Sequence, residues 1–180
     1  MSMIDAQYLE WFNEQFDYAD TLTWCTTTSL HDVLAAYDMQ AEHAQPGHLD
    51  DLYEFRLFAG RLVHGTLVVQ PNGCPTREAL LALAQHGPCL SVQWSDTAPP
   101  GVTYLDKGQV IAFFDPFHRE FHPVPDYASV ERWIAATPAG QGMWDEDWAL
   151  ATIITAEALF QGAVDEEWVQ ATHTAVPEDE

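Results

Sequence analysis

The sequence VTYLDKGQVIAFF, residues 102–114, has the pattern of two β-strands joined by a tight turn. Apolar and β-branched side chains fill both halves, and Asp106, Lys107 and Gly108 between them suit a hairpin turn. Residues 90–94, shortly before this stretch, alternate between apolar and polar side chains, which is typical of a strand with one buried face. We therefore expect three neighbouring strands in an antiparallel sheet.

Two segments nearer the N-terminus add strands to this sheet. Residues 21–26 form a run rich in threonine with apolar side chains at alternating positions, which favours a strand. Residues 53–57 also alternate, and Gly60 is expected to turn the chain into a further strand over residues 62–69. The sequence thus predicts a mostly antiparallel sheet of about five or six strands.

Helical patterns lie at both ends of the chain. Ile4, Tyr8, Phe12 and Phe16 recur every four residues, which predicts an amphipathic helix over residues 3–19. Other predicted helices begin at Ser29, Pro75 and Asp126, and a long one over residues 144–161 stops at Gly162 before a short turn at 165–168. The expected fold is one α+β domain over residues 1–175 in which N- and C-terminal helices flank the sheet, with residues 176–180 as a flexible acidic tail.

The charge of the chain excludes several classes of function. Its 180 residues include 28 Asp and Glu against 6 Lys and Arg, so the formal net charge is −22. A field of this sign repels phosphate groups, which excludes direct binding of nucleic acid and of anionic membranes. With 47% apolar residues the chain can nevertheless build a core.

The N-terminus and the cysteines indicate a compartment. The first residues lack the basic region and the apolar run of a signal peptide, so we expect a cytoplasmic protein. Cys25, Cys74 and Cys89 are widely spaced, which fits a reducing compartment and favours neither a disulfide framework nor a zinc site. All three are expected to be small packing residues.

Acidic residues concentrate at the two ends of the chain. Residues 1–55 and 133–180 hold 21 of the 28 acids, and all six Lys and Arg lie between these segments. One interpretation is solubility alone, since a high net charge keeps proteins apart. The other is a broad negative surface, which forms if the two ends pack on the same side of the domain.

Two acidic segments stand beside tryptophans: WDEDW, residues 144–148, and DEEW, residues 165–168. One interpretation is structural, because acids at a helix start favour the helix dipole and the tryptophans can belong to the core. The functional interpretation is a binding surface, because aromatic anchors ringed by carboxylates complement a partner rich in Lys and Arg. The candidate partner-binding residues are Glu10, Glu14, Asp17, Trp144, Asp145, Glu146, Asp147, Asp165, Glu166, Glu167 and Trp168.

A possible metal site follows the last strand of the hairpin. His118 and His122 are four residues apart and Asp115 precedes them, a set that would bind a transition metal if it lay on a helix. Because Pro116 and Pro123 bracket the segment, exposed loop histidines are the other interpretation. The chain has no glycine-rich phosphate-binding motif and no nucleophile-elbow motif, so we assign no catalytic residue and no cofactor.

The order of these elements resembles an uncharacterised bacterial family, the domain of unknown function 6461. The matching pieces are the strand at 21–24 that leads into a helix, LVVQPNG at 67–73, the strand at 90–94, the turn before VIAFFDP at 110–116 and the late alanine-rich helix. The resemblance spans roughly residues 8–170, and Gln70 stands where that family is expected to have an acidic residue. Since the family has no assigned activity, the resemblance implies the fold and leaves the function open.

Three functions remain open. The first is a non-enzymatic acidic binding protein that neutralises a basic partner, such as an immunity protein against a toxin nuclease or an inhibitor that imitates nucleic acid. Acids at every fourth residue of a helix are about 6 Å apart, more widely than the phosphates of one strand at about 3.4 Å, so mimicry requires at least two acidic stripes. The second is a metal-dependent enzyme that uses Asp115, His118 and His122, and the third is a structural scaffold subunit.

Overall fold

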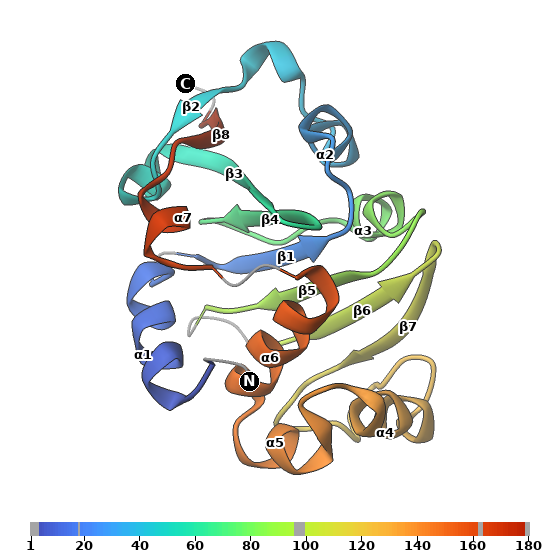
Figure 1. Cartoon of the computed structure of the whole chain (residues 1–180). Helices are drawn as coiled ribbons and strands as arrows, with labels where there is room; N and C mark the ends of the chain where they lie inside the picture. Colours follow the sequence, from blue (N-terminus) through green and yellow to red (C-terminus); the bar gives the residue numbers. More distant parts are fainter. Residues whose placement is uncertain (1–3, 18, 96–99, 162–163, 179–180) are drawn as a thin grey trace.

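The computed structural model describes residues 4–17, 19–95, 100–161 and 164–178. In these residues, an antiparallel sheet of eight strands forms the centre of the molecule (Figure 1). In the order in which they lie side by side, the strands are β2 (Gln45–Gly47), β8 (His173–Pro177), β3 (Phe55–Leu62), β4 (Gly65–Gln70), β1 (Thr21–Cys25), β5 (Cys89–Gln93), β6 (Val102–Asp106) and β7 (Gln109–Phe114). Every neighbouring pair is antiparallel. The α+β class with an antiparallel sheet is confirmed, whereas the expected five or six strands were too few.

Strands β2 and β8 are the two that the sequence did not predict. β2 has three residues, one of which is Pro46, so it shows no alternating pattern. β8 extends into the segment that was expected to be a flexible tail: Val176 is buried and pairs with Leu57 of β3. The tail therefore does not begin at residue 176, and the last two residues, 179 and 180, lie outside the described part of the chain.

The first hairpin turns at a different place from the predicted one. Gly60 lies inside β3 and pairs with Leu67 of β4, and the chain reverses at Val63 and His64. The glycine is needed for a tertiary contact, described below, and not for a turn.

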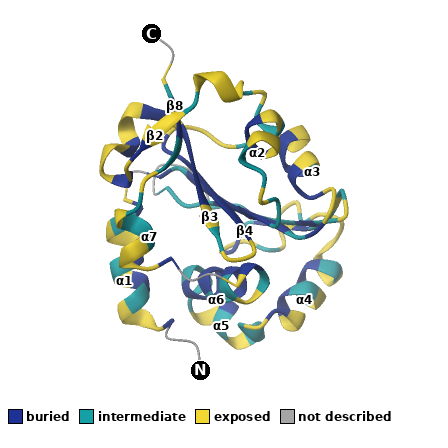
Figure 2. Cartoon of the chain, turned by 45° about the horizontal axis from the view of Figure 1, so that its top comes forward, coloured by how far each residue is buried: buried dark blue, intermediate teal, exposed yellow. Residues whose placement is uncertain are grey.

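Helices cover both faces of the sheet (Figures 1 and 2). The helices α1 (Ala6–Gln15), α4 (Tyr127–Ala136), α5 (Gly140–Glu146) and α6 (Trp148–Phe160) contribute to the core of one face, which contains Phe12, Phe58 and Phe114. The helices α2 (Leu30–Ala36) and α3 (Arg77–Leu83) cover the other face, where Cys25, Val68 and Cys89 are buried. The remaining short helices are η1 (Ala41–His43), η2 (Leu49–Glu54) and α7 (Glu166–Gln170).

The long helix expected over residues 144–161 is broken at Asp147. The backbone of Asp147 is extended (φ −149°, ψ 91°), so this residue ends α5 and begins α6. Its Oδ1 accepts a hydrogen bond from Leu150 N at 3.0 Å and thereby caps α6. The expected stop at Gly162 lies outside the described residues. Among the helices that the structure describes, none has the length and apolar character to cross a membrane.

Candidate binding site

Trp144 belongs to the core and not to a binding surface. Its side chain is 1% exposed, and its ring packs edge-on against Phe114 with the ring centroids 5.6 Å apart. The indole Nε1–H donates a hydrogen bond to Thr137 Oγ1 at 2.9 Å. The prediction that Trp144 contacts a partner is therefore wrong, because the ring fills the space between α5 and β7.

Asp145 is partly neutralised by Arg119. The Arg119 Nη1 atom lies 2.7 Å from Asp145 Oδ1 and 3.4 Å from Glu131 Oε1, and Nη2 donates to the Trp144 carbonyl at 2.7 Å. The Arg119 side chain is 11% exposed, so this cation is held within the fold. The ion pair ties the segment after β7 to the end of α5, next to the exposed side chain of Glu146.

Two of the predicted binding acids have a structural role. Asp147 caps α6, and Asp165 caps α7 by accepting a hydrogen bond from Trp168 N at 2.8 Å. Asp147 and Asp165 therefore stabilise helix starts, which agrees with the structural interpretation of the two acidic segments. Glu166 and Glu167 follow in the first turn of α7, and their side chains are exposed.

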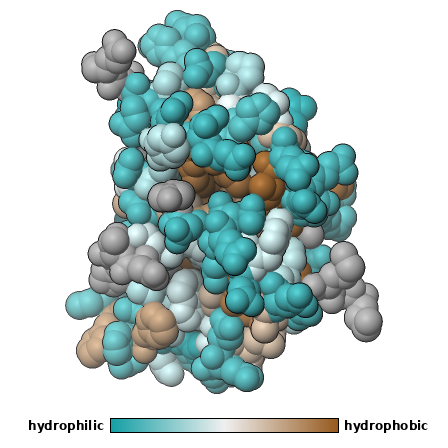
Figure 3. All heavy atoms as spheres, turned by 90° about the vertical axis from the view of Figure 1, so that its left-hand side faces the viewer, coloured by the Kyte–Doolittle hydropathy of each residue, from teal (hydrophilic) through white to brown (hydrophobic). Residues whose placement is uncertain are grey.

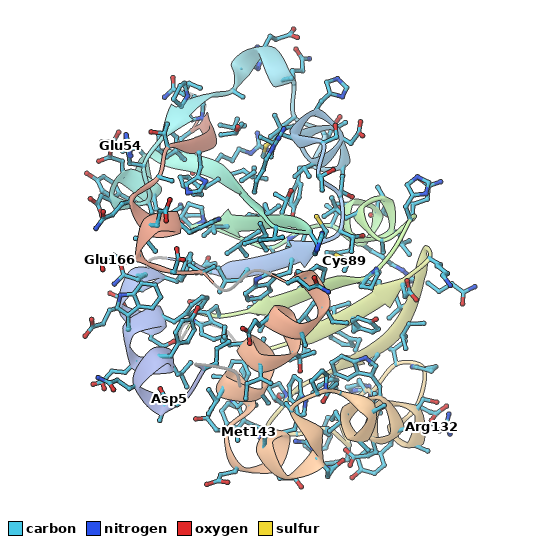
Figure 4. The ribbon with its side chains drawn as sticks, viewed as in Figure 1. Asp5, Glu54, Cys89, Arg132, Met143 and Glu166 are labelled. Atoms are coloured by element: carbon cyan, nitrogen blue, oxygen red, sulfur yellow. The ribbon has the colours of Figure 1, made fainter. Side chains whose placement is uncertain are left out.

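Helix α7 lies next to the C-terminal end of α1 (Figure 1). The Tyr8 hydroxyl donates to the Val164 carbonyl, and the rings of Phe16 and Trp168 are 6.3 Å apart. Figure 4 shows Asp5 of the α1 cap and Glu166 of α7 on the same side of the molecule. We call the exposed acids in or next to these two helices the α1–α7 acidic face. They are Glu10, Glu14, Asp17, Asp165, Glu166 and Glu167.

Electrostatics agree with this placement. Burial first of all, and then the nearby charges of Glu157 and Asp165, raise the pKa of Tyr8 above its usual value. The carboxylate of Asp165, which caps α7, is therefore close enough to Tyr8 of α1 to affect the pKa of its hydroxyl. The predicted acids of α1 and α7 thus belong to elements that contact each other, whereas Asp145, Glu146 and Asp147 lie at the junction of α5 and α6.

Trp168 lies against strand β3 at Gly60, which leaves room for it. A Cβ atom at residue 60 would be 2.2 Å from Trp168 Cζ2 and 2.7 Å from His173 Nδ1. The Trp168 Nε1–H donates to the Arg61 carbonyl at 2.9 Å, and His173 Nε2–H donates to the Trp168 carbonyl at 2.7 Å. Burial is the main cause that lowers the pKa of His173 and so favours its neutral ring.

An open cavity of about 990 Å³ lies beside Trp168. Its walls come from α2, η1, β2, β3, α7 and β8, and they combine apolar residues such as Leu34 and Leu62 with the charged Arg61, Asp165 and Glu167. On the side of the molecule that carries α1 and α7, Figure 3 shows apolar surface in a hollow bordered by hydrophilic side chains. The sequence did not predict this cavity, because its walls come from segments far apart in the chain.

Asp115, His118 and His122 do not form a metal site. Asp115 Oδ1 accepts hydrogen bonds from the backbone N–H groups of Phe117 at 2.8 Å and His118 at 3.2 Å, so the carboxylate closes the turn after β7. Within the described ranges, no three His, Cys, Asp or Glu side chains are grouped so that they could hold a metal ion. The segment is not helical, and the alternative of a metal-dependent enzyme therefore lacks the geometry that it requires.

Five large apolar side chains are exposed between the end of β7 and the start of α4. They are Phe113, Phe117, Phe121, Val124 and Tyr127, with exposed fractions of 39% to 65%. Phe117 and Phe121 lie in the loop between the two elements, and we call these two side chains the aromatic surface. Val124 and Phe113 share two backbone hydrogen bonds of 2.9 Å, so the segment folds back along the edge strand β7. Arg119 fixes the middle of this segment beside Asp145, and Glu120 next to it is exposed.

The sequence did not predict the aromatic surface. Its signal was present: Phe117 and Phe121 stand in a segment bracketed by prolines, where no strand or helix could bury them. Exposed aromatic side chains therefore occur in this fold at Phe117 and Phe121, whereas Trp144 is buried.

Comparison of the chain with protein-family models, with curated proteins and with solved structures finds no match. The resemblance to the domain of unknown function 6461 is neither supported nor refuted by this result, and it stays an expectation.

Proposed function

We propose that this chain is a non-enzymatic binding protein that neutralises a partner rich in Lys and Arg, such as a toxin or a nucleic-acid-binding enzyme. One observation carries the proposal: large aromatic side chains are exposed beside the carboxylates at the end of α5, in a chain with a net charge of −22. Grouped exposed apolar side chains mark interaction sites in soluble proteins. A partner would bury Phe117 and Phe121 as anchors while the carboxylates complement its cations.

The α1–α7 acidic face would act at longer range. Its six exposed acids lie in or next to two helices that contact each other through the rings of Phe16 and Trp168. Such a face attracts a basic protein over a Debye length, about 10 Å at 0.1 M salt. In this proposal the acidic face accelerates the encounter, and the aromatic surface holds the complex.

The aromatic surface is tested by the dissociation rate of a partner recovered by crosslinking in the native cell. The double variant Phe117→Ser, Phe121→Ser should release the partner at least about 30-fold faster, the equivalent of about 2 kcal/mol. Tyr53→Ser with Val63→Ser is the matched control, because Tyr53 is 61% and Val63 is 71% exposed away from this surface. Equal dissociation rates for the two double variants would show that the aromatic surface is not the contact.

The acidic face is tested by the association rate at two salt concentrations. Reversal of Glu10, Glu14 and Asp17 to Lys should slow association at low salt by about tenfold, and 0.5 M NaCl should remove the difference. Reversal of Asp32, Glu42 and Glu78 changes the net charge equally at other exposed positions and serves as the control. An association rate that is independent of salt in the unmodified chain would mean that the acidity serves solubility, as in a plain scaffold subunit.

A further inference from the structure

We propose that Cys25 and Cys89 form a site for a reversible disulfide bond, a covalent modification that does not depend on the proposed partner. Both are free cysteines, and both are fully buried between the sheet and helices α2 and α3. Their sequence positions indicated packing residues only, because nothing in the spacing shows that residues 25 and 89 face each other.

The register of the sheet places the two cysteines directly opposite each other on the antiparallel strands β1 and β5. The next residue, Thr26, donates its backbone N–H to the Pro88 carbonyl at 3.2 Å and so belongs to a hydrogen-bonded pair. Since the two kinds of pair alternate, Cys25 and Cys89 form a non-hydrogen-bonded pair, in which the Cα atoms are about 4.5 Å apart. Disulfides span Cα separations of about 4.4–6.8 Å, so the strands need no large movement.

A neighbouring pair shows how closely side chains approach at this place. Thr23 and Ser91 are also directly opposite each other on β1 and β5, two residues along from the cysteines. Their Oγ atoms lie 2.8 Å apart. Because every second residue of a strand points to the same face, the sulfur atoms of Cys25 and Cys89 project side by side in the same way.

The thiol of Cys25 has another contact in the reduced state. Its Sγ lies 4.0 Å from the carbonyl oxygen of Thr27 and 3.8 Å from that of Thr66, and thiols are weak donors. The sulfur of Cys25 must leave these two weak contacts to reach Cys89, and a rotation about χ1 is the movement that we expect.

The chemistry needs an oxidant, for which a peroxide suffices. The two thiols lose two protons and two electrons as the S–S bond forms, and hydrogen peroxide takes them up and becomes two water molecules. Burial raises the pKa of Cys25 to about 11 and that of Cys89 well above its usual value, so the reactive thiolate is scarce in the closed fold. Oxidation should therefore be slow and should require a transient opening of the layer formed by α2 and α3.

The experiment uses the full chain with Cys74→Ser, which removes the exposed third thiol and leaves the buried pair unchanged. The folded protein is treated with hydrogen peroxide, unfolded, and alkylated, and its intact mass is measured. We expect the loss of two hydrogen atoms, no alkylated thiol, and a peptide that links Cys25 to Cys89 after digestion. A dithiol reductant should restore two alkylated thiols, and the oxidised chain should unfold at a higher urea concentration than the reduced one.

A parallel oxidation in concentrated urea separates the effect of the fold from intrinsic reactivity. The folded chain should react more slowly, but the intramolecular link should make up a larger fraction of its oxidised product than in the unfolded chain, in which the two thiols are far apart. Two alkylated thiols after treatment, or sulfinic acid in place of the link, would overturn the proposal. Cys89→Ala is the second variant: under the same treatment it should lose the link and the increase in urea resistance.

Discussion

Because Gly60 has no side chain, the ring of Trp168 can pack against strand β3. Replacing this glycine therefore tests the packing of Trp168. Gly60→Ala is expected to lower the free energy of unfolding by about 1–3 kcal/mol, since the new Cβ would lie 2.2 Å from Trp168 Cζ2. Urea unfolding followed by tryptophan fluorescence measures the change. Gly142→Ala is the control: no atom lies within 4 Å of its Cβ position in α5, so the stability should stay equal or rise. Equal loss in both variants would contradict the packing of Trp168 on β3.

His173 should make the stability depend on pH. The unfolded chain binds a proton at this histidine near pH 6.5, whereas burial lowers the pKa in the folded chain. Between the two pKa values, the unfolded state therefore binds more protons than the folded state. The contribution of His173 to the free energy of unfolding is complete above about pH 6.5 and declines as the pH falls.

The change in urea midpoint between about pH 7.5 and pH 5 measures this effect. It should be smaller in His173→Gln than in the unmodified chain. His43→Gln, at an exposed position, is the matched control variant. If His173→Gln and His43→Gln behave alike, the buried histidine does not contribute.

At the scale of elements, the break between α5 and α6 depends on Asp147. Asp147→Ala should lower the free energy of unfolding by about 1 kcal/mol, because the N–H of Leu150 loses its acceptor at the start of α6. Asp147→Asn keeps an oxygen acceptor and should be nearly neutral, which separates the cap from the charge. Chemical denaturation of the three proteins measures both effects, and an equal loss in the two variants would contradict the cap.

Local patterns were sufficient for the elements that form from local sequence. Alternation over residues 90–94 and 102–114 predicted β5, β6 and β7, because each of these strands pairs with a neighbour in sequence. β2 could not be predicted, since it has three residues and one of them is a proline. β8 could not be predicted, since it pairs with β2 and β3 over a long sequence separation. The predicted turn at Gly60 failed for a related reason: the glycine makes room for Trp168, which comes much later in the chain.

The candidate site could be predicted only in part. Acids beside tryptophans allowed both a core and a surface interpretation, and burial decides between them: Trp144 is 1% exposed, whereas Trp168 lines a cavity. The cavity itself is a product of tertiary structure, since η1, β2 and α7 meet there. No single segment of the sequence contains that information.

For the whole molecule, the net charge of −22 predicts that salt stabilises the fold. Like charges are closer together in the compact state than in the unfolded chain, and added ions screen their repulsion. Raising NaCl from about 0.02 M to 0.5 M should therefore increase the thermal midpoint. The variant with Glu10, Glu14 and Asp17 changed to Lys should respond less, because it carries fewer uncompensated acids. A midpoint that does not change with salt would show that the acids are too far apart to repel each other.

The order of the strands also has a consequence for biosynthesis. β8 is the last strand along the chain, yet it lies between β2 and β3 in the sheet. A ribosome releases the chain from its N-terminus, so β2 has no partner strand, and β3 has one open edge, until residues 173–177 have emerged. We expect the sheet to be completed only after β8 has been synthesised, and the nascent chain to expose unpaired strand edges until then, which a chaperone would shield.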